Sequence, residues 1–436
     1  MMSDDSAAKK IKMTEHAAAP ADDHCAHYVH RKKRYCKMTP NKGSVYCGAH
    51  EPASEVIDDP AAERIPCPLD PKHTVFKRKL AKHLKICNAR DQDSNLPYIV
   101  RNINAGEELV DVTEQDMEDY CSLKLHTVED AEFYGVIDKV KRLYETHIAN
   151  KIEQLDKRHS SLKEAIEEED LGMETRRHLV QTSALLGILQ EDQQLIDNTS
   201  FIEFGAGKGQ LAFFLATALE SQKLSNSQLL LIDRLSLRHK KDNKLTNKEL
   251  VQRIRADIAD LKMSQLPELQ RTKRNVAISK HLCGAATDLT LRCALNDAAC
   301  SADYILIALC CHHRCSWRSY VGKAFLQAAD ISVREFVIIT KMVSWAVSGT
   351  GLSRERRKAM AEETQPPQES ITQRLSLEER EDIGYQCKRM LDYGRVEFLR
   401  TNGFEASLKF YVPRNITLEN VILLARRKPN NEKSIS

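Results

Sequence analysis

The stretch TSFIEFGAGKGQLAFFLATAL, residues 199–219, decides the fold of this chain. An apolar run leads into Gly205, Gly207 and Gly209, and an apolar helical pattern follows them directly. Glycines at these positions let the backbone turn tightly and approach a ligand closely. The stretch therefore predicts a buried strand, a ligand-binding turn and a helix that begins at that turn.

Further apolar runs alternate with helical patterns on the C-terminal side of this turn. SQLLLID, RNVAISKHL and DYILIALCC predict buried strands, and ATDLTLRCALND predicts a helix between two of them. This alternation indicates a parallel, doubly wound sheet. Near the end, GRVEFLRTNGF predicts a helix closed by Gly403, and LKFYVP and NVILLARRK predict two more strands. We therefore expect an α/β domain over residues 192–430, with a C-terminal antiparallel hairpin and a charged insertion at 312–380.

The pattern E-x-G-x-G-x-G differs from the dinucleotide-binding pattern and resembles motif I of the class I S-adenosylmethionine-dependent methyltransferases. Asp233 ends the next strand, where a carboxylate can accept hydrogen bonds from both ribose hydroxyls of that cofactor. Asp257 is expected to end a third strand, near the adenine amino group. A dinucleotide-binding or degenerate Rossmann domain is the alternative. The candidate cofactor-binding residues are Glu203, Gly205, Gly207, Gly209, Asp233 and Asp257.

The fourth strand ends in Ser279-Lys-His-Leu-Cys-Gly284, and groups at the carboxyl ends of strands face the cofactor in this fold. Methyltransferases that act on amino groups of bases usually carry an Asp/Asn-Pro-Pro-aromatic motif here, which this chain lacks. A ribose 2′-hydroxyl is a weak acid, so its methylation needs a positioned base or a nearby cation. Lys280 and His281 are therefore the catalytic candidates, with phosphate binding or a structural contact as the alternative for Lys280.

Residues 64–90 carry four metal-ligand side chains with the spacing C-x5-H-x9-H-x3-C. Two of them bracket a Pro-rich turn, and the other two are four residues apart on an expected helix. The segment is too short to fold on a hydrophobic core alone, and a tetrahedral zinc site would supply the missing stability. The alternative is scattered Cys and His on an amphipathic helix. The candidate ligands are Cys67, His73, His83 and Cys87.

Residues 24–50 show a second pattern, C-x10-C-x10-C-x2-H, which predicts another zinc module. The candidate ligands are Cys25, Cys36, Cys47 and His50, with His24, His27 and His30 as competitors for the fourth position. A denser cluster, Cys310-Cys-His-His-Arg-Cys315, directly follows the strand YILIAL. A loop at the substrate site, a third metal site and simple packing all remain open for it.

The net charge of +3 hides an uneven distribution of basic residues. Residues 24–50 hold six Lys/Arg and no Asp/Glu, and residues 64–90 hold eight Lys/Arg and one Asp. This concentration favours an anionic partner, most plausibly nucleic acid, over a merely solvated basic surface. No apolar stretch is long enough for a membrane span, and the N-terminal residues lack the apolar core of a secretory signal. We expect an intracellular, reducing location for the 13 cysteines, in the nucleus, the cytoplasm or both.

Three other segments complete the expected organisation. Residues 1–23 predict a disordered tail, and residues 51–63 predict a linker between the two small modules. Residues 128–191 show charged, helical periodicity, which predicts either a short coiled coil or a helical hairpin on the next domain.

Taken together, these motifs resemble the eukaryotic tRNA 2′-O-ribose methyltransferases that modify nucleotide four of the acceptor stem. In that family a CCCH zinc segment and a CHHC finger precede the methyltransferase domain, and FIEFGAGKGQL, SKHLCGAATDLTLRC and CCHHRCSW look like its domain motifs. The resemblance implies S-adenosylmethionine and two structural zinc ions as cofactors, and tRNAs such as those for glycine, proline and histidine as substrates.

Two competing hypotheses remain from the sequence. One is a non-catalytic RNA-binding or splicing-associated protein with zinc fingers and an inert Rossmann-like domain. The intact glycines and Asp233 argue against it. The other is methylation of a protein side chain, which the basic zinc modules argue against.

Overall fold

The structure is a computed structural model of the 436-residue chain. It describes residues 24–29, 34–36, 39–40, 43–47, 63–87, 96–107, 113–224, 226–235, 237, 241–298, 300–347 and 375–429. The tail expected at 1–23 and all but the last residue of the linker expected at 51–63 lie outside these ranges. The chain divides into two compact units, residues 1–91 and residues 92–436, and each is described by itself.

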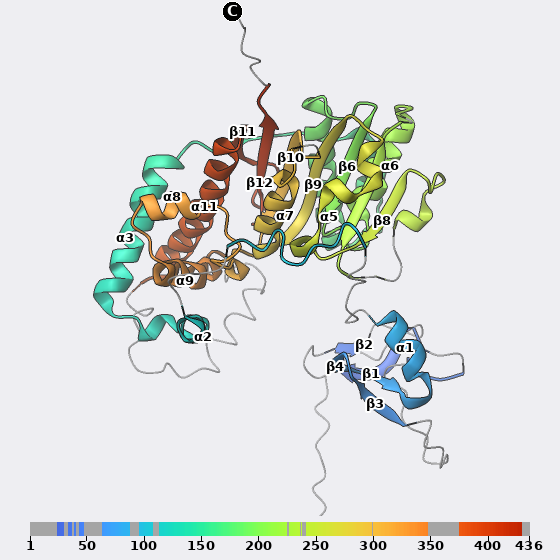
Figure 1. The fold of residues 1–436 in the computed structure, drawn as a ribbon, viewed down its shortest axis with the longest axis horizontal. Helices are drawn as coiled ribbons and strands as arrows, with labels where there is room; N and C mark the ends of the chain where they lie inside the picture. Colours follow the sequence, from blue (N-terminus) through green and yellow to red (C-terminus); the bar gives the residue numbers. More distant parts are fainter. Residues whose placement is uncertain are drawn as a thin grey trace, which may run out of the picture. The chain divides into compact units, whose positions relative to one another are not determined.

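An eight-stranded sheet forms the centre of the second unit (Figure 1). Its order is β5-β11-β12-β10-β9-β6-β7-β8. The strands are β5 Glu153–Gln154, β6 Thr199–Phe204, β7 Gln228–Asp233, β8 Val251–Arg255, β9 Arg274–Cys283, β10 Tyr304–Cys310, β11 Phe404–Phe410 and β12 Val421–Arg427. The five strands from β8 to β10 are parallel, and β12 runs antiparallel to both β10 and β11. The predicted doubly wound sheet with a terminal antiparallel hairpin is therefore confirmed.

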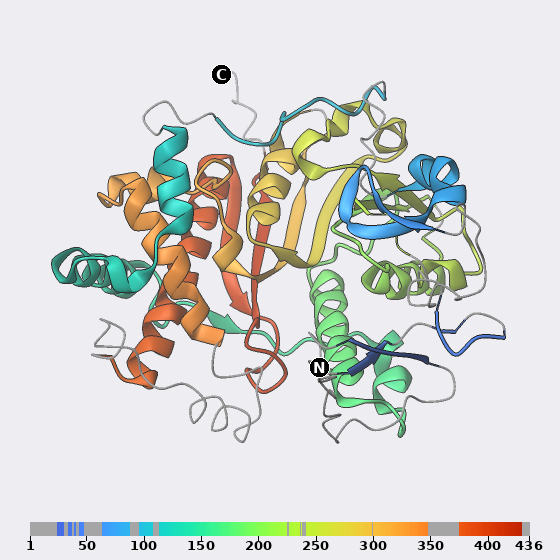
Figure 2. The same cartoon turned by 90° about the horizontal axis from the view of Figure 1, so that it is seen from below.

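Helices cover both faces of this sheet. Successive residues of a strand point to opposite faces, so each strand contributes side chains to both layers of packing. Phe201 of β6 packs with α5 (Met173–Glu191) and α6 (Gln210–Ser221). Its neighbour Ile202 packs on the other face with α7 (Ala285–Leu295) and the C-terminal part of α11 (Leu377–Thr401). Figure 2 shows α5 and α7 on opposite sides of the strands. The sheet is therefore buried on both faces, which explains its near-continuous apolar strands.

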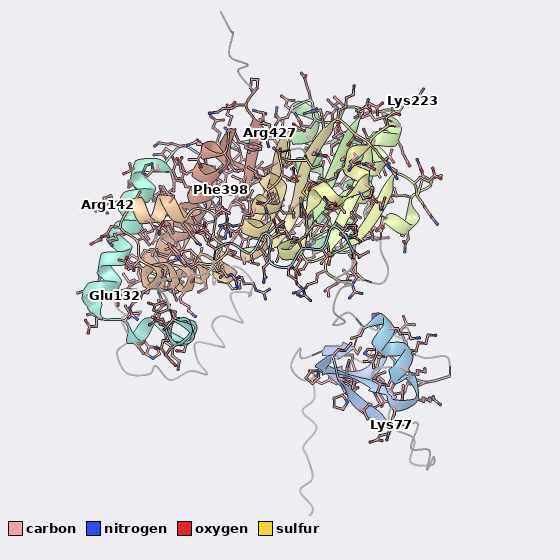
Figure 3. The ribbon with its side chains drawn as sticks, in the orientation of Figure 1. Lys77, Glu132, Arg142, Lys223, Phe398 and Arg427 are labelled. Atoms are coloured by element: carbon pink, nitrogen blue, oxygen red, sulfur yellow. The ribbon has the colours of Figure 1, made fainter. Side chains whose placement is uncertain are left out.

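Besides the two hydrophobic cores on the faces of the sheet, a third core lies beside it. It includes one of the helices formed by residues 128–191. Here α3 (Asp130–His147) packs against α11, together with α8 (Lys323–Ala328) and α9 (Val333–Met342). Glu132 of α3, labelled in Figure 3, forms two hydrogen bonds with Arg334 of α9, at 2.7 and 3.0 Å. The segment is two long helices separated by β5 and the short α4 (Lys163–Glu167), and these helices belong to different cores. Neither the coiled coil nor the hairpin expected from periodicity is present in these residues, because the apolar face of α3 is covered by its own domain.

The structure also differs from the sequence-based expectation for the insertion and for the start of the last helix. The insertion expected at 312–380 begins with packed helices up to residue 347, and residues 348–374 lie outside the described ranges. The last helix starts at Leu377, where Ser376 and Glu379 form a capping box, so it is much longer than its GRVEFLRTNGF end suggested. No helix in the described ranges is both long and apolar enough to cross a membrane.

The described residues of the first unit form two small hairpins and one helix. The hairpins pair β1 (Cys25–Val29) with β2 (Arg34–Cys36), and β3 (Arg64–Cys67) with β4 (Asp70–Phe76). A short 3-10 turn leads from β4 into α1 (Leu80–Ile86). The described side chains here form only a small apolar cluster built from three cysteines and Tyr46. A unit with so little apolar core needs another source of stability.

Candidate active site and zinc sites

The glycine-rich turn follows β6 and lies beside the carboxyl end of β7. Gly205, Gly207 and Gly209 all have positive φ, at 66°, 53° and 71°. A Cβ on Gly209 would lie only 2.6 Å from Asp242 Oδ1, and the positive φ of this residue would strain any other side chain. The N–H of Gly207 donates to Asp233 Oδ2 at 2.7 Å, which fastens the turn to the end of β7. The structure therefore brings the three glycines and Asp233 together.

Two residues that sequence reasoning missed support the outside of this turn. Arg253 of β8 binds both carboxylate oxygens of Asp242, at 2.9 and 2.6 Å. Its third nitrogen donates to the Gly207 carbonyl at 3.0 Å. A bidentate pair of this kind is strongly directional, so it fixes the turn in place. The only signal in the sequence was the position of Arg253 on the strand that follows Asp233.

Glu203 is buried inside the turn rather than exposed to a ligand. Its Oε2 accepts the N–H of Ala212, in the first turn of α6, at 3.0 Å. Burial raises the pKa of Glu203 to about 8, although the Ala212 N–H and nearby cations act in the opposite direction. This side chain connects the strand to the helix that follows, so its geometry favours a supporting role.

Asp257 lies beyond the end of β8, which stops at Arg255, so the prediction that Asp257 ends the third strand was wrong by two residues. Its carboxylate caps a short 3-10 turn by accepting the N–H of Ala259 at 3.0 Å. It also forms an ion pair with Arg234 at 3.8 Å, just after β7. Asp257 therefore follows the carboxyl end of β8, the strand next to the one that ends in Asp233.

Lys280 and His281 both reach toward α5 from the end of β9. Lys280 Nζ donates to the His178 carbonyl at 2.8 Å and to the Thr182 hydroxyl at 3.1 Å. His281 Nε2 lies 3.0 Å from Gln181 Oε1. With the amide in this orientation Nε2 carries the proton, and Nδ1 keeps its lone pair. The backbone of His281 has φ 67° and forms a bulge in the pairing with β10, which turns its side chain to the same face as Lys280.

Burial lowers the pKa of both residues. The pKa of Lys280 falls to about 8, with the Glu203 carboxylate opposing the effect of burial. The pKa of His281 falls to about 4, through burial first and then through the positive charge of Lys280. At neutral pH the structure therefore places a largely protonated lysine beside a neutral histidine. Such a pair offers one cation and one group able to accept a proton.

Six of the described zinc-ligand candidates form two groups. The sulfur atoms of Cys25, Cys36 and Cys47 lie within 4.8 Å of one another. In the other group the Cys67 and Cys87 sulfurs are 3.8 Å apart, and His83 Nε2 lies 3.1 Å from Cys67 Sγ. Cys87 follows α1 in an extended conformation, so it is not on the helix as expected. His50, His30 and the side chain of His73 lie outside the described residues.

A family model described as Methyltransferase TRM13 matches residues 180–426, more than half of the chain. The chain belongs to the TRM13 methyltransferase family. Two further models match the N-terminal unit: the CCCH zinc finger in TRM13 protein at residues 23–51, and the U11-48K-like CHHC zinc finger at residues 64–88. Family models thus match both small modules as well as the large domain.

Similar proteins extend the match over almost the whole chain. The mouse and human proteins named "tRNA:m(4)X modification enzyme TRM13 homolog" are each 32% identical. These alignments cover 93% of this chain and 95% of the mouse protein, and 95% of this chain and 96% of the human protein. The Schizosaccharomyces pombe protein named "tRNA:m(4)X modification enzyme TRM13" is 33% identical over 84% of this chain and 96% of its own length.

Membership of the TRM13 family confirms several expectations. The large domain is a methyltransferase with the class I sheet order, and S-adenosylmethionine is the cofactor that its glycine-rich turn suits. Zinc is the metal of the two finger modules. The arrangement of thiols in both fingers fits this metal, because zinc ligands must converge on one point.

A network of buried charged side chains holds residues 310–315, here called the CCHHRC loop, against two helices of this TRM13-family domain. Arg395 of α11 binds both oxygens of Asp288 of α7, at 3.1 and 2.7 Å, and also Asp392 at 3.0 Å. His312, in the loop, lies 2.6 Å from Asp392 through Nε2. Burial alone would raise the pKa of Asp392, but His312 and Arg389 hold it well below its usual range. Sequence reasoning missed this network because its members are far apart in the chain.

We expect Asp233→Ala to weaken S-adenosylmethionine binding while the protein stays folded. The carboxylate already accepts the N–H groups of Gly207 and Leu235, each at 2.7 Å, and each oxygen keeps a second lone pair for a ribose hydroxyl. Losing charge-assisted hydrogen bonds should cost about 1.5–3 kcal/mol, or roughly 10- to 150-fold in Kd measured by calorimetry.

The matched control is Asp197→Ala. Asp197 also accepts a backbone N–H, that of Asn226 at 2.9 Å. It precedes the amino end of β6, whereas Asp233 lies at the carboxyl end of β7. Its loss should leave the Kd for S-adenosylmethionine unchanged. Equal binding by Asp233→Ala and the parent protein would show that this carboxylate does not hold the cofactor.

Proposed function

We propose that this chain transfers a methyl group from S-adenosylmethionine to tRNA, on the 2′-hydroxyl of nucleotide four in the acceptor stem. The observation that carries the tRNA substrate is the match over 93–95% of the chain to relatives named as tRNA modification enzymes. The tRNAs for glycine, proline and histidine are the proposed substrates, because the sequence motifs resemble those of the eukaryotic family that acts on them. The role is intracellular, in the nucleus, the cytoplasm or both.

The choice of a ribose hydroxyl rests on the groups at the end of β9. Enzymes that methylate an amino group of a base usually carry an Asp/Asn-Pro-Pro-aromatic segment here, whereas this strand carries Lys280 and His281 shortly before its last residue, Cys283. S-adenosylmethionine supplies an activated methyl group, so the protein must mainly position the hydroxyl and handle its proton. We assign proton removal to neutral His281 and stabilisation of the developing alkoxide to protonated Lys280.

The two zinc modules are proposed to dock the tRNA. Basic residues predominate in both segments, and the acceptor stem is an A-form helix whose major groove is too deep and narrow for side chains to read. Contacts to phosphate and shape are therefore the available mode of recognition. Lys77, labelled in Figure 3, illustrates the exposed basic side chains beside α1, with a side chain 56% exposed.

We expect removal of residues 1–90 to greatly reduce tRNA affinity and to leave S-adenosylmethionine binding intact. The chain divides near residue 91, so the cut falls between two compact units. In the full chain, tRNA binding should weaken steeply between about 50 and 200 mM salt, because each phosphate contact releases counterions. A filter-binding series at several salt concentrations measures both effects. Equal tRNA affinity of the truncated and full-length proteins would contradict the docking role.

Methyl transfer to purified tRNA, followed by nucleoside mapping, tests the proposed reaction directly. The decisive substrate pair is a tRNA with an ordinary nucleotide four and the same tRNA with a 2′-deoxy nucleotide at that position. We expect incorporation only into the first. Equal methylation of both would exclude the 2′-hydroxyl of nucleotide four, and a failure to bind S-adenosylmethionine would support the inert-domain alternative.

A further inference from the structure

Three thiols converge at the carboxyl ends of β9 and β10, outside both zinc-finger modules. Cys283 and Cys310 are the last residues of these neighbouring parallel strands and lie opposite each other, and Cys311 follows directly. The three sulfur atoms lie within 4.8 Å of one another. Neither finger model covers these residues, which lie inside the match to the methyltransferase domain.

The backbone adopts unusual conformations to bring these thiols together. Successive residues of a regular strand point to opposite faces, so Cys310 and Cys311 would ordinarily diverge. Cys311 instead has φ 50° and ψ 43°, in the left-handed region that residues other than glycine rarely occupy. On the other strand, His281 has φ 67° two residues before Cys283. Such strain persists only where the surrounding structure enforces it, and it is concentrated at functional sites.

The separation of the sulfur atoms fits metal coordination. In a tetrahedral site with Zn–S bonds of about 2.3 Å, two sulfur ligands lie about 3.8 Å apart. Cys283 and Cys310 have an Sγ–Sγ distance of 3.8 Å. Cys67 and Cys87, in the matched CHHC finger of the same chain, have the same distance, 3.8 Å. Two sulfurs of the cluster therefore already have the spacing seen in a zinc finger.

We propose that Cys283, Cys310 and Cys311 bind a zinc ion through three thiolates, with the fourth position open to water. Thiolates are preferred ligands of zinc, and three protein ligands with one open position form a common zinc geometry. The ion would join the end of β9, which carries Lys280 and His281, to the loop that follows β10. It would thus fix the position of the two proposed catalytic side chains relative to the CCHHRC loop.

Zinc content measured by mass spectrometry of the purified full-length chain tests the proposal. With one ion in each finger, we expect three ions per chain in the parent and two in Cys283→Ser or Cys311→Ser. Cys283 and Cys311 are both half-buried, so their replacement should disturb packing less than replacement of the buried Cys310. The matched control is Cys300→Ser, which removes a buried thiol of the same domain that lies outside the cluster. This control should keep all three ions.

Finger variants separate this site from those already assigned. Cys67→Ser should lose one ion while the cluster keeps its own, and Cys67→Ser combined with Cys311→Ser should lose two. Circular dichroism with a thermal melt shows whether each variant remains folded. A parental content of two ions, a content unchanged by Cys311→Ser in a folded protein, or a Cys283–Cys310 disulfide in the intact mass of the purified parent would each overturn the proposal.

Discussion

Replacing His281 with Ala, or Lys280 with Ala, is expected to lower the single-turnover rate of methyl transfer by at least about 100-fold. His281 is neutral at pH 7 because burial lowers its pKa to about 4, so it can accept the proton of the ribose hydroxyl without further adjustment. Lys280 is anchored to the His178 carbonyl and the Thr182 hydroxyl, which holds its charge at a fixed place. Rapid-quench measurements with tRNA and saturating S-adenosylmethionine provide the rate.

Matched substitutions separate chemistry from backbone effects. His281→Asn keeps a residue that tolerates positive φ but removes the base, so it should be as slow as His281→Ala. Lys280→Arg keeps the charge and should recover part of the lost rate. Lys273→Ala removes an exposed lysine just before the same strand, at its other end, and should behave as the parent. Near-parental rates in both Ala variants would place the base elsewhere, with the CCHHRC loop as the next region to test.

The pH profile distinguishes the two roles. If His281 is the base and Lys280 the cation, the rate is level between about pH 6 and 7.5, since His281 stays neutral and Lys280 stays protonated. It then declines as pH rises through the Lys280 pKa of about 8. If neutral Lys280 were the base, the rate would instead increase up to about pH 8. A rising profile would therefore reverse the assignment.

Asp288→Ala is expected to reduce the free energy of unfolding by about 3–5 kcal/mol, the usual cost of leaving one partner of a buried ion pair alone. Asp288 and Arg395 are both essentially inaccessible, and their side chains share two hydrogen bonds, at 3.1 and 2.7 Å. Without the carboxylate the guanidinium keeps only Asp392 as its acidic partner in the described structure. Urea unfolding followed by circular dichroism measures the loss.

The control for this variant is Glu191→Ala, which breaks a surface ion pair of the same domain. Glu191 and Lys157 are 2.8 Å apart, with side chains 61% and 35% exposed. An exposed pair contributes about 0–1 kcal/mol, so the midpoint should hardly move. Similar losses in Asp288→Ala and Glu191→Ala would mean that the buried network contributes no more than a surface contact.

Local patterns in the sequence predicted much of the fold. The four parallel strands with the longest apolar runs, the glycine-rich turn and the terminal hairpin all appear where expected, because each is encoded by neighbouring residues. The third strand was misplaced at Asp257, since VQRIR has few apolar residues and lies at the sheet edge. The helical periodicity of residues 128–191 was real, but periodicity alone does not say what covers an apolar face.

The sequence by itself determined the fold class, the cofactor turn and the two zinc modules, because each depends on residue types at short, fixed spacing. Only the tertiary structure decided which groups meet from distant parts of the chain. It placed Arg253 on the glycine-rich turn, Arg395 on Asp288, and Cys283 beside Cys310 and Cys311. Such contacts depend on the order of strands, the packing of helices and unusual backbone angles, and these features arise only when remote segments are buried together.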